Sequence, residues 1–217
     1  MLAAINGDTA NTNFSARNDR QENATMTTRI LISFLLFCKV GYSQTLIADA
    51  KKVKSAYENL SADTNSKKLQ QVYIAAFPPE TNSFFAIFQT TKFDQLYMDS
   101  YKYIEAFEKC AATFPTEVIG KCVDIGKNLV WDADAVGELQ QISVNLAIKH
   151  LTVFISKYKT LDKREQDKLI NFYADVENHS AYPEYQELID KLKLVGEIDI
   201  AKKFETARTI RMKRQDH

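Results

Sequence analysis

Glycine and proline are scarce in this sequence, with 6 and 4 copies among 217 residues. Strand-rich folds and phosphate-binding loops both depend on glycine, so the low count argues against both and favours helices. An excess of charge of one sign is missing as well, because 28 Lys and Arg residues balance 28 Asp and Glu residues. Without a net charge, no strong field attracts nucleic acid or an anionic membrane surface. We therefore expect no nucleic acid partner.

The sequence also lacks the motifs of common catalytic and metal sites. It contains no Gly-x-Ser-x-Gly, His-Glu-x-x-His or phosphate-loop pattern, and no Glu-x-x-His pair for a di-metal site. The three histidines, His150, His179 and His217, have no Cys or His at metal-ligand spacing. We expect no metal ion, no cofactor and no assignable catalytic residue. An enzyme that uses paired carboxylates would leave no comparable signature in the sequence.

The N-terminal part of the sequence has the layout of a targeting signal. Residues 1–25 are polar and patternless, a composition that cannot bury enough apolar surface to fold. After them come Met26-Thr27-Thr28-Arg29, the apolar run Ile30–Phe37, and Gly41-Tyr42-Ser43 before Gln44. A basic segment, a short apolar segment and small residues in this order are typical of a secretory signal peptide.

This layout predicts an exported protein, either periplasmic or extracellular. We expect three segments: a disordered or mis-annotated extension over 1–25, a signal peptide over 26–43 and a single helical domain over 44–217. The apolar run is too short to span a bilayer, so no stable membrane span is expected after cleavage. A short buried helix is the alternative interpretation, and Lys39 close to the cleavage point favours it. Lipidation of Cys38 is disfavoured, because Phe37 stands where a small residue is required.

From residue 45 onward the sequence indicates helices, because apolar residues recur at spacings of three and four. The expected helices are 45–61, 67–77, one from Pro79, 94–112, 115–130, 134–159, one from Asp162, one from Tyr182 and one from Ile198. The fold class is therefore all-α, with eight or nine helices. Short connections predict either an irregular antiparallel bundle or a curved stack of helix pairs. The helix over 134–159 is apolar on more than half of its circumference, so it is expected to be central.

Several helix ends carry specific signals. Asp134 is placed to cap the central helix, and Asp162 with Glu165 forms a capping-box pattern. Pro183 suits a first helical turn, and Gly196 suits a helix C-terminus.

The predicted mature domain contains two cysteines, Cys110 and Cys122, on either side of a helix break at Pro115. In an antiparallel hairpin these positions face each other, and an oxidising compartment would allow a disulfide between them. Such a bond would stabilise the fold by roughly 3 kcal/mol. The alternative interpretation is a pair of buried thiols that pack as small apolar residues.

Aromatic residues are concentrated between Tyr73 and Phe114, and core packing accounts for most of them. Tyr97 and Tyr101 differ, because they lie one turn apart at the edge of the apolar stripe, with Asp94 nearby. We predict that Asp94, Tyr97 and Tyr101 form a surface that binds a ligand or a partner. A half-buried flank of the core is the other interpretation.

Two functions are compatible with these observations. The first is an exported helical interaction module with a protein partner, for example an immunity-type inhibitor of a secreted toxin. The second is an enzyme or small-ligand binder with an inter-helix pocket near Tyr97 and Tyr101. A cavity lined by carboxylates with shifted pKa values would favour the second, and a broad exposed apolar surface would favour the first.

Overall fold

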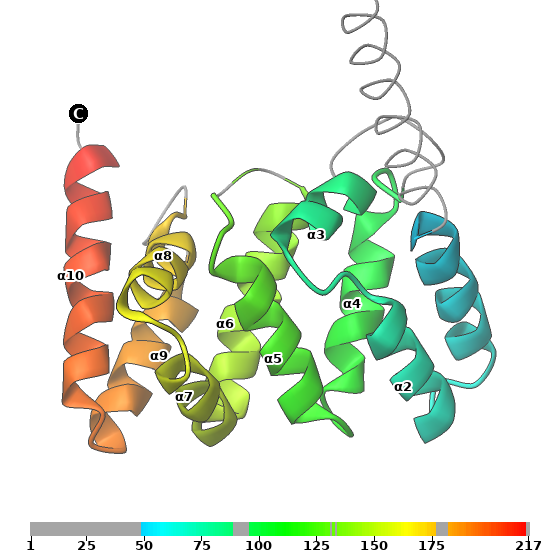
Figure 1. The fold of residues 1–217 in the computed structure, drawn as a ribbon. Helices are drawn as coiled ribbons and strands as arrows, with labels where there is room; N and C mark the ends of the chain where they lie inside the picture. Colours follow the sequence, from blue (N-terminus) through cyan, green and yellow to red (C-terminus); the bar gives the residue numbers. More distant parts are fainter. Residues whose placement is uncertain (1–48, 89–95, 131, 133, 177–181, 216–217) are drawn as a thin grey trace, which may run out of the picture. The chain divides into compact units, whose positions relative to one another are not determined.

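A computed structural model gives the fold of the chain (Figure 1). The chain divides into two units, Met1–Thr45 and Leu46–His217. The structure describes parts of the second unit, namely residues 49–88, 96–130, 132, 134–176 and 182–215. The predicted extension and signal peptide, together with Cys38 and Asp94, lie outside the described residues.

The described residues form helices joined by turns, without strands, and this confirms the all-α class. A first helix covers residues 49–62. The following helices are α2 (Lys67–Ala76), α3 (Thr81–Phe88), α4 (Ser100–Cys110), α5 (Pro115–Gly126), α6 (Ala135–Lys149), α7 (Leu151–Lys159), α8 (Lys163–Ala174), α9 (Pro183–Leu194) and α10 (Ile198–Gln215).

The predicted count of eight or nine helices was too low, since the described residues form ten. The helix expected over 134–159 is divided at His150, where the backbone leaves the helical region with φ −123° and ψ 50°. Hydrogen bonds continue through the break, because the His150 N–H donates to Leu146 O and the His150 carbonyl accepts from Phe154 N. The break allows α6 to pack on α4 and α9 while α7 packs on α5.

Local signals fix several helix ends as predicted. The Asp162 carboxylate accepts from the Glu165 N–H, and the Glu165 side chain accepts from the Asp162 N–H, so the capping box is confirmed. Pro115 and Pro183 occupy the first turns of α5 and α9. Gly196 has φ 82°, a left-handed conformation that glycine adopts without strain, at the end of α9.

Asp134 stands at the N-cap position of α6, but its side chain makes no capping hydrogen bond. The carboxylate instead accepts a hydrogen bond from the Tyr97 hydroxyl. The backbone of Asp134 has φ 58°, an unusual conformation for a residue with a side chain. A long-range contact therefore replaces the local cap that the sequence predicted.

The helices of Leu46–His217 pack as a bundle. On one side α4, α6 and α9 follow one another, and on the other α5 contacts α3, α7 and α8. The last helix, α10, packs against both α8 and α9. In Figure 1, α4 and α6 begin at the upper end, and α5 ends there. None of the described helices combines the length and hydrophobicity needed to cross a bilayer.

Two groups of aromatic rings fill the core. The first joins Tyr57, Tyr73, Phe77, Phe84, Phe88, Tyr103 and Phe107. The second joins Phe154, Tyr158, Phe172, Tyr173, Tyr185 and Phe204. Two buried hydroxyls within these groups have main-chain partners, since Tyr73 donates to Tyr103 O and Tyr185 donates to Phe204 O. The buried Tyr158 hydroxyl has no hydrogen-bond partner among the described atoms.

Candidate functional site

Cys110 and Cys122 are both buried, and both are free thiols in the structure. The predicted disulfide is therefore not present. The Cys110 sulfur donates to Ala106 O on the side of α4 that faces the first helix and α2. The Cys122 side chain instead lies beside Ser143 of α6 and Tyr173 of α8. The two helices are turned so that their cysteines face different neighbours, and each thiol packs as a small apolar group.

Tyr97 and Tyr101 lie where α4 begins, and Met98 follows Tyr97 in the turn before the helix. Tyr97 is partly exposed, Met98 is 83% exposed and Tyr101 is 55% exposed. These three residues are called the aromatic end surface below. Large apolar side chains in such exposed positions leave contact area available for a partner.

Carboxylates surround the aromatic end surface. Asp134 accepts a hydrogen bond from the Tyr97 hydroxyl, and this bond raises the pKa of Tyr97. Asp132 lies close enough to Tyr97 to contribute to the same pKa shift. Asp99 forms an ion pair with Lys102 in the first turn of α4. Among the described residues, Asp99, Asp132 and Asp134 therefore place three carboxylates near this surface, against the single ammonium group of Lys102.

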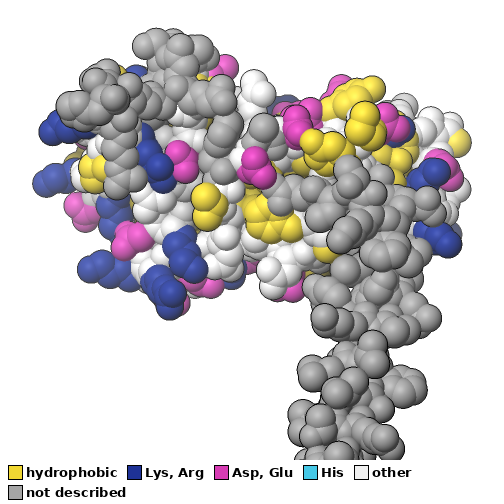
Figure 2. Space-filling model, turned by 90° about the horizontal axis from the view of Figure 1, so that it is seen from above, with side chains coloured by type: hydrophobic (Ala, Val, Ile, Leu, Met, Phe, Trp, Pro, Cys, Tyr) yellow, Lys and Arg dark blue, Asp and Glu magenta, His cyan; other side chains and the backbone are white. Residues whose placement is uncertain are grey.

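Figure 2 shows the end of the helices at which α4 and α6 begin. Hydrophobic and acidic side chains lie side by side on the part of this face toward α3 and α4. Lys and Arg side chains gather instead toward α10. Acidic side chains also lie among these Lys and Arg side chains.

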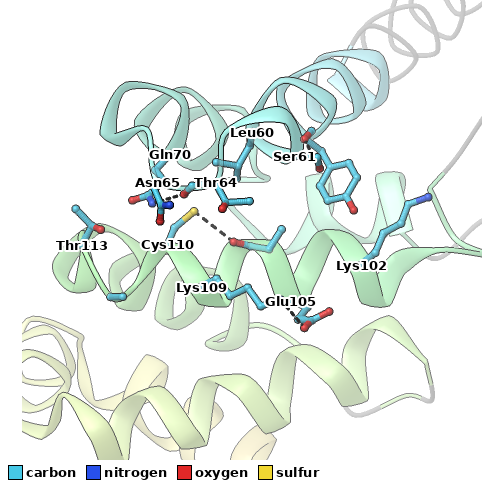
Figure 3. Close-up of a pocket in the computed structure, with 13 residues that line it drawn as sticks. Leu60, Ser61, Thr64, Asn65, Gln70, Lys102, Glu105, Lys109, Cys110 and Thr113 are labelled. Carbon is cyan, nitrogen blue, oxygen red and sulfur yellow. Dashed lines mark hydrogen bonds and ion pairs between the residues drawn. The ribbon is translucent and has the colours of Figure 1, made fainter.

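A groove of about 400 Å³ lies between the first helix, the turn after it and α4 (Figure 3). Figure 3 shows Asn65 and Gln70 near Cys110 at one end of the groove, and Lys102 toward the other end. The lining contains both polar and apolar side chains. It consists of Tyr57, Leu60, Ser61, Thr64, Asn65, Gln70, Lys102, Glu105, Ala106, Lys109, Cys110, Ala112 and Thr113.

Most polar groups of this groove already have partners within the protein. The Lys109 ammonium pairs with the Glu105 carboxylate at 2.7 Å. The Gln70 Nε2 donates to Thr64 O at 2.7 Å, whereas the Gln70 Oε1 is buried without a partner among the described atoms. An unpaired buried acceptor is costly, so a small donor at this point would be stabilising.

Carboxyl groups with shifted pKa values lie elsewhere. Burial raises the pKa of Glu108 on α4 and of Glu138 on α6, and the nearby Glu105 carboxylate raises both further. Neither Glu108 nor Glu138 lines the groove in Figure 3, and neither Tyr97 nor Tyr101 does. This groove is thus not the predicted pocket near Tyr97 and Tyr101, and carboxylates with raised pKa values do not line it.

A second hollow, of about 480 Å³, lies between α2 and α5 and contains Lys121. Sequence reasoning missed this residue, although a signal was present. Lys121 follows Val118 by three positions and precedes Ile125 by four, and both of these are fully buried. A lysine at this spacing lies on the apolar side of its helix, where an unpaired charge is unusual.

Comparison of the chain with protein-family models, with curated proteins and with solved structures gives no match.

Proposed function

We propose that this protein is an exported interaction module that binds a basic and apolar protein segment through the aromatic end surface. The observation that carries the proposal is the exposure of Met98 and Tyr101 amid an excess of carboxylates. An immunity-type inhibitor of a secreted toxin would be one instance of such a module.

The side chains of this surface suit protein recognition. Tyrosine and methionine are enriched at the centres of interfaces, where they provide large contact area. Carboxylates at the edge favour a partner with Lys or Arg beside a large apolar residue, because complementary charge steers association and discriminates among partners. Asp99, Asp132 and Asp134 supply these carboxylates.

The surface is also held in place before a partner arrives. The hydrogen bond from Tyr97 to Asp134 joins the turn before α4 to the turn before α6. Leu96 is buried, and its N–H donates to Ile87 O at the end of α3. The turn is therefore ordered before binding, so less conformational entropy is lost when a partner binds, and this strengthens binding.

Selection from a library of random peptides tests the proposal. The selected peptides are expected to carry Lys or Arg next to a large apolar side chain. Replacing Met98 and Tyr101 together with serine should weaken their binding at least tenfold, since each side chain of an interface centre contributes about 1 kcal/mol or more. Isothermal titration calorimetry with a purified peptide measures the change.

Leu194 provides a matched control, because it is 86% exposed and is the last residue of α9. Leu194→Ser should leave the affinity unchanged. Unchanged affinity in the Met98/Tyr101 double variant would contradict the proposal, as would selected peptides that are predominantly acidic.

A small-ligand binder that uses the groove in Figure 3 is the second candidate, and the unpaired Gln70 Oε1 favours it. A ligand in this groove would contact Gln70 and Lys109, but not Met98. The Met98/Tyr101 double variant therefore separates the two candidates, because it should alter only binding at the aromatic end surface.

Export is the part of the proposal that rests on the segment over 26–43. We expect the protein secreted by its native host to begin at Gln44, and intact mass measurement would give this start directly. The mass should not change on reduction, because Cys110 and Cys122 are free thiols in the structure. A retained segment over 26–43 would contradict the export proposal without affecting the aromatic end surface.

A further inference from the structure

Lys121 is held at the wall of the hollow between α2 and α5. Its ammonium nitrogen Nζ donates a hydrogen bond to the main-chain carbonyl of Phe77, the residue that ends α2. The hollow of about 480 Å³ is large enough for a small organic molecule. Its apolar lining residues include Ile74, Ala75, Phe114 and Gly120.

The partner of the Lys121 ammonium group differs in charge from the partners of the ion-paired lysines. The ammonium groups of Lys102, Lys109, Lys127 and Lys193 each lie beside a carboxylate. Lys121 instead contacts a neutral carbonyl oxygen.

Three charged groups surround the Lys121 side chain. Asp124 lines the same hollow, but its carboxylate is bound by Lys127 and Lys157. Glu117, one turn before Lys121 on α5, also lines the hollow, and Lys52 of the first helix adds a positive charge.

We propose that Lys121 is a nucleophilic amine that forms an imine with small aldehydes and ketones entering this hollow. The hydrogen bond to Phe77 uses one N–H of the amine, so the neutral form keeps its lone pair for attack. This inference does not depend on the proposed interaction function.

The electrostatic environment supports this assignment. Partial burial, and secondarily the positive charge of Lys52, lower the pKa of Lys121 to about 8. Desolvation and a neighbouring cation are the two means by which proteins activate lysine nucleophiles. At pH 7.5 about a quarter of amines with a pKa of 8 are neutral, against about one in a thousand at a pKa of 10.5. Carboxylate partners raise the pKa of Lys102 and Lys109, which makes their neutral forms rarer still.

The reaction requires no oxidant or reductant. The neutral Nζ adds to the carbonyl carbon, and the electron pair of the C=O π bond passes to oxygen. A proton moves from nitrogen to oxygen to give a carbinolamine. The hydroxyl group then leaves with a further proton as water, and a C=N bond remains.

Reductive trapping on the full chain tests the proposal. The protein is treated briefly at pH 7.5 with propanal and cyanoborohydride, which donates hydride to the imine and leaves a stable propyl-lysine. Peptide mass mapping then gives the rate at each lysine. Lys121 is expected to react at least tenfold faster than Lys102, Lys109, Lys127 and Lys193, after allowance for the lower nucleophilicity of a less basic amine.

Two controls separate this reactivity from simple accessibility. In urea-unfolded protein the preference for Lys121 should disappear, because the hollow and the burial are lost. The rate at Lys121 should also rise to half of its maximum near pH 8, whereas the other four lysines should continue to gain beyond pH 10.

Lys121→Arg keeps a positive donor for Phe77 O but removes the primary amine. The rapid alkylation by propanal should therefore be lost, while the thermal stability should remain similar. Equal alkylation rates at Lys121 and the four paired lysines in the folded protein would overturn the proposal. Rapid alkylation that persists unchanged in Lys121→Arg would do the same.

Discussion

Replacing Phe107 with alanine is expected to lower the free energy of unfolding by about 3–5 kcal/mol. The Phe107 ring is fully buried and stacks on Phe77, with centroids 3.9 Å apart and ring planes at 4°. Phe77 also contacts Phe84 and Phe88 of α3. Because α2, α3 and α4 all hold rings against this position, the surrounding structure has little freedom to collapse into the cavity.

Tyr101→Ala provides the control for this effect. It removes an aromatic ring from the same helix at an exposed position, and it should change stability by no more than about 0.5 kcal/mol. Urea denaturation followed by far-ultraviolet circular dichroism would measure both variants. A loss smaller than about 1 kcal/mol for Phe107→Ala would show that the stacked pair does not anchor this part of the core.

Raising the pH above 9 is expected to destabilise the fold steeply. Burial raises the pKa of Cys110 to about 11 and of Cys122 to about 12. Burial also raises the pKa of six tyrosines: Tyr73, Tyr103, Tyr158, Tyr173, Tyr182 and Tyr185.

The direction of the effect follows from which state loses its protons first. Each of these pKa values is higher in the folded than in the unfolded protein, so the unfolded chain ionises at lower pH. Their stabilisation is complete below pH 9 and is lost as the pH rises, first through the thiols and above pH 10 through the tyrosines. Lys121 acts in the opposite direction, since its lowered pKa adds stability between pH 8 and 10.5.

The size of the alkaline effect is large for a single domain. Cys122 alone would lose about 4 kcal/mol by pH 12. With the tyrosines included, the loss by pH 11 is on the order of 10 kcal/mol, comparable with the whole stability of a typical domain. We therefore expect the protein to unfold between pH 10 and 11.

Urea titrations at a series of pH values would measure this dependence. In Cys122→Ala the fall in stability between pH 9 and 10 should be smaller than in the unsubstituted protein by about 1 kcal/mol, because one of the two titrating thiols is absent. An identical slope in the two proteins would mean that Cys122 is not buried as a thiol.

The helical class and many helix ends could be predicted because they depend on neighbouring residues. The capping box at Asp162 and the glycine at position 196 act within one turn, so their effect is already present in the local sequence. The buried aromatic stripes follow from the same spacing rule. The break at His150 carries no proline or glycine, and it reflects the separate packing of α6 and α7.

The candidate sites depend more strongly on tertiary structure. The spacing of Cys110 and Cys122 predicted that they would face each other, but spacing gives no information on how each helix is rotated about its axis. Asp134 was expected to cap its own helix, whereas it binds Tyr97, which is 37 positions away in the sequence. Lys121 acquires its environment from Phe77 and Lys52, both distant in the sequence.

The sequence by itself determined that this chain forms amphipathic helices, where several of them begin and end, and which aromatic rings are buried. These properties arise from interactions within a few residues and from the apolar periodicity of each helix. Only the tertiary structure decided the break at His150, the separation of the two thiols and the position of Lys121. Helix rotation and side-chain burial are set by packing among all the helices at once, and no single segment encodes them.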